Sequence, residues 1–182
     1  FKDAGKSAVQ KAMRERWETA DTRRIVDAMM ESPHCADTQE IGCATLWSLF
    51  QGDMRAEIMY RITNGPGVKA VIAAMKLMAD SVAVQECGCA ILCALAIDNE
   101  EVVVKIYDEG GVDVTAEALK RQWSSAMVVQ HGLGFLRAAA SLVEYRHAMA
   151  EQIALVGIIE GMHAFRGKVL VAEYGLSLLG FL

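Results

Sequence analysis

The chain has little proline and no long uninterrupted apolar stretch. Its 182 residues include two prolines, Pro33 and Pro66, whereas 53% of the residues are hydrophobic. Disordered and low-complexity chains lack this apolar content, so the sequence predicts an ordered protein with a large core. No segment approaches the roughly 18 uncharged apolar residues that a membrane span needs. No signal peptide is visible, although the chain starts at Phe1 rather than Met.

An excess of basic residues is also missing. The formal net charge is −5, from 18 Lys and Arg against 23 Asp and Glu. Nucleic-acid-binding domains normally carry a basic footprint, so the composition disfavours generic nucleic-acid binding. An acidic surface suits basic partners, but a net charge of this size is also what ordinary solubility requires.

Patterns that carry catalysis or metal binding are absent as well. There is no Cys-x-x-Cys pair, no histidine cluster and no Gly-x-x-x-x-Gly-Lys loop for phosphate. Cys89 and Cys93 could meet on one helix face, but a metal site would need further ligands. The odd number of cysteines on apolar stretches favours buried thiols in a reducing compartment. We therefore predict no catalytic residue, no metal and no cofactor, and an intracellular, cytoplasmic location that leaves nuclear or cytoskeletal association open.

What the sequence has instead is a glycine that recurs inside apolar, helix-like runs. The series is Gly42, Gly88, Gly132 and Gly175, at steps of 46, 44 and 43 residues. A second series in phase with it, each member followed by Val or Ile, is Gly67, Gly111 and Gly157. Such periods are typical of solenoids built from two- or three-helix repeats. Glycine inside a helix costs about 1 kcal/mol relative to alanine, so we expect the first series to let a neighbouring helix cross closely.

The stretches between these glycines predict three helices per unit. Short first helices are expected over 57–63, 101–108 and about 145–155, and second helices over 68–78, 112–121 and 158–166. A polar link and a long, glycine-containing third helix follow each second helix. Helix stops with left-handed turns are expected at Gly65, Gly110, Gly111 and Gly157. Strand-period alternation is absent, so the expected fold is all-α.

We interpret the chain as one array over residues 1–182. Its parts are a partial opening repeat (1–35, with helices over 7–19 and 22–32), repeats at 36–80, 81–124 and 125–167, and the third helix of a truncated repeat (168–182). The apolar ending Leu178–Leu182 lacks the polar face that terminal repeats normally carry. This ending predicts that the sequence is a piece of a longer array.

The run Val-Gln-Glu-Cys-Gly-Cys-Ala-Ile-Leu-Cys-Ala-Leu-Ala at 84–96, followed by Asn99, Ile106 and Gly110-Gly111-Val112, resembles the armadillo repeat. The resemblance covers nearly all of the chain from about Thr22 and is closest over 82–125. It implies a right-handed armadillo-like α-solenoid of about four three-helix repeats, whose third helices line a concave groove. HEAT repeats are the neighbouring alternative, and the Gly-Gly-Val turn favours armadillo. A fold of this kind hosts many roles.

The resemblance also defines positions at which armadillo nuclear-import receptors clamp a peptide. Those receptors place Trp two residues after the small third-helix residue and Asn four residues later. The Trp positions hold Ala44, Ala90, Gly134 and Ser177. The Asn positions hold Ser48, Ala94, Ala138 and Phe181. None of them matches, so recognition of nuclear localisation peptides is disfavoured.

The candidate binding surface combines these eight positions with a mostly acidic row at the same helical phase. The members of this glutamate row are Glu40, Glu86, Gln130 and Glu173. One interpretation is a shallow groove with an acidic rim that receives a basic or amphipathic helix of a protein partner. The other is a solvated helix face, with glutamates placed near helix N-termini.

We therefore expect a non-enzymatic protein-interaction scaffold. The main alternative is a structural or regulatory segment of a larger protein or assembly whose activity lies elsewhere. A helical-repeat enzyme has less in its favour, because the sequence shows neither a cofactor-binding cleft nor a reactive side chain.

Overall fold

The computed structural model describes residues 22–52, 54–152 and 155–182, and within these ranges every regular element is an α-helix. The all-α expectation is confirmed there, whereas the helix expected over 7–19 lies outside the described residues. None of the described helices combines the length and apolar character needed to cross a membrane. The helices are α2 (Thr22–Glu31), α3 (Ala36–Phe50), α4 (Arg55–Asn64), α5 (Gly67–Leu77), α6 (Val82–Ala96), α7 (Glu100–Asp108), α8 (Gly111–Arg121), α9 (Ala126–Ser141), α10 (Val143–Gln152), α11 (Leu155–Ala164) and α12 (Val169–Phe181).

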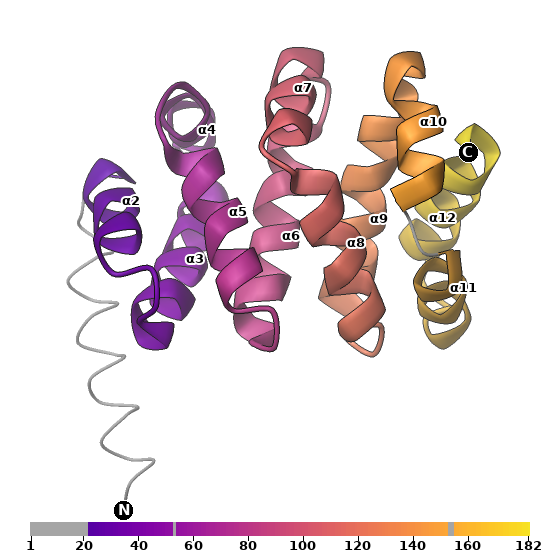
Figure 1. The fold of residues 1–182 in the computed structure, drawn as a ribbon, viewed down its shortest axis with the longest axis horizontal. Helices are drawn as coiled ribbons and strands as arrows, with labels where there is room; N and C mark the ends of the chain where they lie inside the picture. The colour runs from indigo at the N-terminus through magenta and orange to yellow at the C-terminus, as the bar shows by residue number, and fades with distance from the viewer. Residues whose placement is uncertain (1–21, 53, 153–154) are drawn as a thin grey trace, which may run out of the picture.

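The helices follow one another along a row of side-by-side units (Figure 1). The short first helices α4, α7 and α10 lie along one edge of this row, at the top of Figure 1, and the second helices α5, α8 and α11 each follow one of them in the chain. The long third helices α3, α6, α9 and α12 pack directly against one another in chain order. Segments about one repeat period apart in the sequence are therefore the neighbours that build the core.

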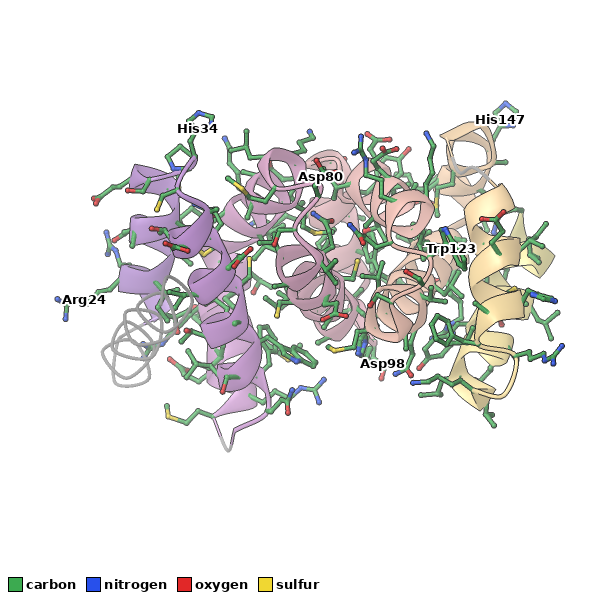
Figure 2. The ribbon with its side chains drawn as sticks, turned by 90° about the horizontal axis from the view of Figure 1, so that it is seen from below. Arg24, His34, Asp80, Asp98, Trp123 and His147 are labelled. Carbon is green, nitrogen blue, oxygen red and sulfur yellow. The ribbon has the colours of Figure 1, made fainter. Side chains whose placement is uncertain are left out.

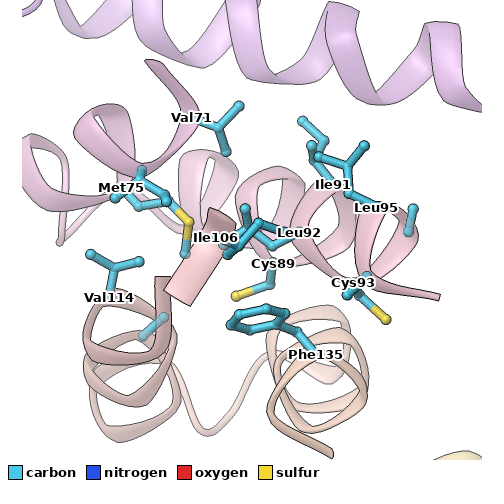
Figure 3. Close-up of a cluster of buried hydrophobic side chains, with 14 of the residues drawn as sticks. Val71, Met75, Cys89, Ile91, Leu92, Cys93, Leu95, Ile106, Val114 and Phe135 are labelled. Atoms are coloured by element: carbon cyan, nitrogen blue, oxygen red, sulfur yellow. The ribbon is translucent and has the colours of Figure 1, made fainter. Parts of the chain in front are cut away.

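The core is continuous from unit to unit. Ile91, Leu92 and Leu95 of α6 are fully buried, and Phe135 of α9 lies in the same cluster (Figure 3). Cys89 faces this cluster as a small apolar side chain (Figure 3). Full burial of one Leu, Ile or Phe side chain contributes about 1.5–3 kcal/mol, so the third helices supply much of the stability.

Each third-helix glycine faces a long side chain from the second helix that precedes it. The pairs are Met29 with Gly42, Met75 with Gly88, Leu119 with Gly132 and Met162 with Gly175. A Cβ atom built on Gly88 would lie 2.6 Å from both Cγ and Sδ of Met75. Because real Cβ atoms essentially never approach another heavy atom within 3.0 Å, only glycine allows this crossing without a shift. The expected close approach at these glycines is confirmed.

In two of the units, a buried glutamine of the third helix binds the carbonyl groups at the C-terminal end of the second helix. Gln85 Nε2 donates to Met75 O at 2.9 Å and to Met78 O at 3.0 Å. Gln39 makes the equivalent pair of bonds at the end of α2. Carbonyls at a helix C-terminus have no partner within the helix, so these amides satisfy groups that the fold would otherwise bury unpaired. In the next unit Val129 takes this position, and no side-chain amide is present there.

The glycines between first and second helices differ from the expectation. Gly110 adopts a left-handed φ of 85° and is the one glycine of the described residues to do so. Gly65 ends α4 with φ −115°, and Gly157 lies inside α11 rather than before it. The prediction of left-handed turns at Gly65, Gly111 and Gly157 is therefore wrong. Gly111 starts α8, where the side chain of Ile106 leaves no room for a Cβ atom.

Replacing Gly88 with alanine should destabilise the protein. The new methyl group would collide with Met75, which is buried, and overpacking of this kind costs about 1–3 kcal/mol. The gain in helix propensity, about 1 kcal/mol, offsets only part of this cost. Gly180→Ala is the matched control, because nothing lies within 4 Å of its Cβ position. Thermal and urea unfolding followed by circular dichroism measure the difference, and equal midpoints for the two variants would contradict the prediction.

Candidate functional site

The structure places the twelve predicted site residues in three environments. We call the exposed and partly exposed residues of α3, α6, α9 and α12 the third-helix surface. The fully exposed members of the predicted set are Ser48 and Glu173. The partly exposed members are Glu40, Ala44, Glu86, Gln130, Ala138, Ser177 and Phe181. The buried members are Ala90, Ala94 and Gly134.

Ala90 is 0% exposed, and helices two units apart touch across its helix. The rings of Trp47 on α3 and His131 on α9 meet edge to face with centroids 5.7 Å apart. The intervening helix α6 lies between α3 and α9 in the row (Figure 1). Side chains from both neighbours therefore meet over α6, where the small residues leave room for them.

The same arrangement recurs one unit later around Gly134. A Cβ atom built on Gly134 would lie 2.7 Å from Cys93 Sγ of α6 and 3.1 Å from a ring carbon of Tyr174 of α12. Cys93 and Tyr174 stand at the repeat positions of Trp47 and His131. The small size of Ala90 and Gly134 thus serves helix packing. Both residues are buried, so the prediction that they contact a partner is not supported by their exposure.

Two members of the glutamate row form bonds between units. Ser81 Oγ donates to Glu40 Oε1 at 2.7 Å, and Ser125 Oγ donates to Glu86 Oε1 at 2.6 Å. Each serine is also the N-cap of the following third helix, since its hydroxyl oxygen accepts a backbone N–H three residues later. We call this arrangement the serine–glutamate link. Each link joins the start of one third helix to a carboxylate of the unit before it.

The serine–glutamate link stops in the C-terminal unit. Gln130 takes the place of the glutamate, and Lys168 takes the place of the capping serine and makes no side-chain cap. Glu173 is the next member of the row and is exposed. The acidic rim expected from the sequence therefore consists of two carboxylates bonded to serines and one exposed carboxylate at α12.

An arginine that the sequence pattern did not single out lies beside Tyr174. Arg137 Cζ is 5.1 Å from the centroid of the Tyr174 ring, a geometry in which the ring face attracts the cation. Arg137 Nε is buried and has no hydrogen-bond partner. A buried donor without a partner costs free energy. Packing against the surrounding side chains must therefore keep the Arg137 side chain in this position. Arg137 stands five residues after Gly132, as Trp47 does after Gly42, which is the sequence signal that could have marked it.

Arg146 and Phe181 form a second cation–ring pair, but this arginine is engaged. Its Cζ lies 4.8 Å from the Phe181 ring centroid. Its Nε donates to Ala140 O at 2.8 Å and its Nη2 donates to Ser141 O at 3.3 Å. Arg146 therefore pairs with the last carbonyls of α9, and Phe181 is partly covered by it.

Burial controls the chemistry of three of the cysteines, and none of the five forms a disulfide. Desolvation raises the pKa of the Cys93 thiol to about 11, and it raises the pKa of Cys43 and Cys89 as well. Thiols in this state are protonated near neutral pH and are weak nucleophiles. The expectation of buried thiols is confirmed for these three, whereas Cys87 is only partly buried. The expectation is wrong for Cys35, which is exposed and whose pKa a hydrogen bond with Thr38 lowers. The described residues contain no cluster of three or more His, Cys, Asp or Glu that could hold a metal ion.

Clefts also open along the edge formed by the first helices. One of about 500 Å³ separates α4 from α7 and is lined in part by Tyr60, Asn99 and Lys105. Between α7 and α10 the rings of Tyr107 and Tyr145 stack instead, with centroids 4.0 Å apart. Side chains that bridge neighbouring units are thus present on this edge of the molecule as well as on the third-helix surface.

Replacing Ser125 with alanine should weaken the joint between α6 and α9. The change removes the N-cap bond to Val128 N–H and the bond to Glu86, and loss of a capping side chain typically costs about 1 kcal/mol, up to about 2. Ser124→Ala is the control, because Ser124 is exposed and is not the cap. A lower unfolding midpoint for Ser125→Ala alone is expected, and equal midpoints would show that the link adds no stability.

His131 should make the protein less stable in mild acid. Burial lowers its pKa below 6.5, so the unfolded chain binds a proton at a higher pH than the folded protein does. Stability from this residue is therefore intact above about pH 6.5 and is lost as the pH falls through the lowered pKa. The variant His131→Phe should show a smaller loss of melting temperature between about pH 7 and pH 5 than the parent. His34→Gln, at an exposed position on the periphery of the molecule (Figure 2), serves as control. Parallel pH profiles of parent and His131→Phe would contradict this.

Comparison of the chain with protein-family models, curated proteins and solved structures found no match.

Proposed function

We propose that this chain is an armadillo-type helical solenoid that acts as a non-enzymatic protein-interaction scaffold. Its binding surface is the third-helix surface, which corresponds to the concave groove that the armadillo resemblance implies. The partner contributes a peptide segment or an amphipathic helix that lies along α3, α6, α9 and α12. The free thiols accord with an intracellular location.

The observation that carries the proposal is the continuity of the third-helix surface from one unit to the next. Trp47 and His131 contact each other across α6, and Arg137 lies over Tyr174 across the α9–α12 boundary. Aromatic and arginine side chains are the types most often found as anchors in protein interfaces. A surface that joins several units suits an extended partner, because each unit adds contacts without a change in the backbone.

The two bonded glutamates bear on the chemistry of that partner. Glu40 and Glu86 already accept hydrogen bonds from Ser81 and Ser125, so part of their acceptor capacity is used within the protein. Arg137 is partly exposed and has no bonded acceptor. These contacts favour an amphipathic partner over a uniformly basic one.

A second candidate function is supported by the outer face of α12. Leu176 and Leu179 are 65% and 36% exposed, whereas Leu133 and Leu136, at the same positions of α9, are 0% exposed. Helix α9 has neighbours on both sides in the row, α6 and α12, and these two positions are buried there. The exposed pair favours a structural segment within a larger assembly, in which another helical element covers α12.

Bulky side chains on the third-helix surface should abolish partner binding while the fold survives. The test variant combines Ser48→Trp and Ser177→Trp, because both serines are at least partly exposed on third helices. Tyr60→Ala, at an exposed position on α4, is the control. Proteins captured from native extract are compared by mass spectrometry, and circular dichroism verifies helix content.

We expect the double variant to lose the partners that the parent and the Tyr60→Ala control retain. Retention of the same partners by all three proteins would overturn the choice of surface. Loss of partners by Tyr60→Ala alone would place the binding site on the first-helix edge.

A further inference from the structure

We propose that Arg137 is the anchor for a carboxylate of the bound partner, supplied by an Asp or Glu side chain of a peptide segment. The inference rests on the proposed function, because it assigns the partner chemistry of the third-helix surface. It narrows the sequence-based expectation of a basic or amphipathic partner to a segment with an acidic residue near α9 and α12.

The first argument is that Arg137 has neither a hydrogen-bond acceptor nor a counter-ion within the described part of the protein. Its Nε is buried without a hydrogen bond, and no described carboxylate lies within ion-pair distance. Arg146, the other partly buried arginine of the described residues, donates to two carbonyl oxygens. A half-buried guanidinium without an acceptor costs free energy that an incoming anion would recover.

The second argument is that neighbouring side chains hold the guanidinium in place. It lies over the ring of Tyr174, and Gly134 lets Cys93 and Tyr174 approach on the same side of α9. The Cys93 thiol remains neutral near pH 7 because burial raises its pKa to about 11, so it supplies no counter-charge. A cation that is already positioned loses little side-chain freedom on binding, which favours affinity.

The third argument concerns the type of anion. Arginine presents a planar set of donors that matches a carboxylate. Phosphate carries more charge and is typically bound by several cations. Arg146, the other partly buried arginine of the described residues, lies over Phe181 of α12 and already donates to Ala140 O and Ser141 O. One cation with unused donors fits a single carboxylate better than a dianion.

The test selects peptides from a random library displayed on phage against the complete 182-residue chain. Selected peptides are synthesised, and their Kd values are measured by fluorescence polarisation for the parent, Arg137→Gln, Arg137→Lys and Arg55→Gln. Arg55 is an exposed arginine on α4 and serves as the matched control. The Ser48→Trp/Ser177→Trp variant reports whether the peptides occupy the third-helix surface.

We expect the selected peptides to share an Asp or Glu, and Arg137→Gln to weaken them at least about tenfold. Arg137→Lys should recover only part of the affinity, because lysine keeps the charge and loses the planar donors. Changing the shared acidic residue to Asn or Gln should weaken binding to the parent and leave binding to Arg137→Gln unchanged. The affinity for the parent should fall with added salt.

A second measurement needs no ligand. Because Arg137 lacks a counter-ion, Arg137→Gln should melt at the same temperature as the parent or higher. A marked drop in the melting temperature would show that Arg137 is a structural residue and would overturn the proposal.

The two proposals fail in different ways. Peptides that bind Arg137→Gln as tightly as the parent, but lose affinity for the Ser48→Trp/Ser177→Trp variant, would overturn the carboxylate anchor and keep the binding surface. Peptides that bind both of these variants like the parent would overturn the surface itself. Failure to select any peptide would count against both proposals.

Discussion

The stability and the surface of this protein both depend on the close contact between consecutive third helices. Glycine at positions such as Gly88 lets a second-helix methionine cross the third helix, and Ala90 lets side chains of the flanking helices meet over it. Glycines inside a helix are unfavourable for the isolated helix. Their cost is offset by the dispersion contacts and the apolar burial that the close approach permits. A larger residue at these positions would separate the units and open the core.

The same contact determines which residues are available for binding. Because Ala90 and Gly134 lie beneath meeting side chains, the floor of the third-helix surface is made of aromatic, sulfur-containing and arginine side chains from alternate units. Each of these contacts joins helices that are one or two units apart. A partner would therefore meet a surface that is fixed by packing rather than by flexible loops, and such preorganised sites lose little entropy on binding.

Much of the helix pattern could be predicted from the sequence, because the glycine period and the polar links repeat. The second helices expected over 68–78 and 112–121 agree with α5 and α8 within one residue at each end. The role of Gly157 could not be predicted, since glycine occurs both in turns and inside helices and only the neighbouring helix decides between them. The serine–glutamate link and the Arg137 site were missed for a related reason. They join residues about 40 positions apart, and the pairing of such residues depends on how far one unit is rotated against the next.

The interrupted serine–glutamate link has a mechanical consequence. Ser81 and Ser125 each cap a third helix and also bind a carboxylate of the preceding unit. Unfolding of one unit therefore removes a bond from the capping residue of the next third helix, so neighbouring units tend to unfold together. Between Gln130 and Lys168 this coupling is missing. Under a pulling force along the row, α12 would therefore separate from α9 against apolar contacts and the Arg137–Tyr174 contact, without a serine–glutamate bond to break. The two earlier joints thus resist separation with a directional polar bond that the C-terminal joint does not have.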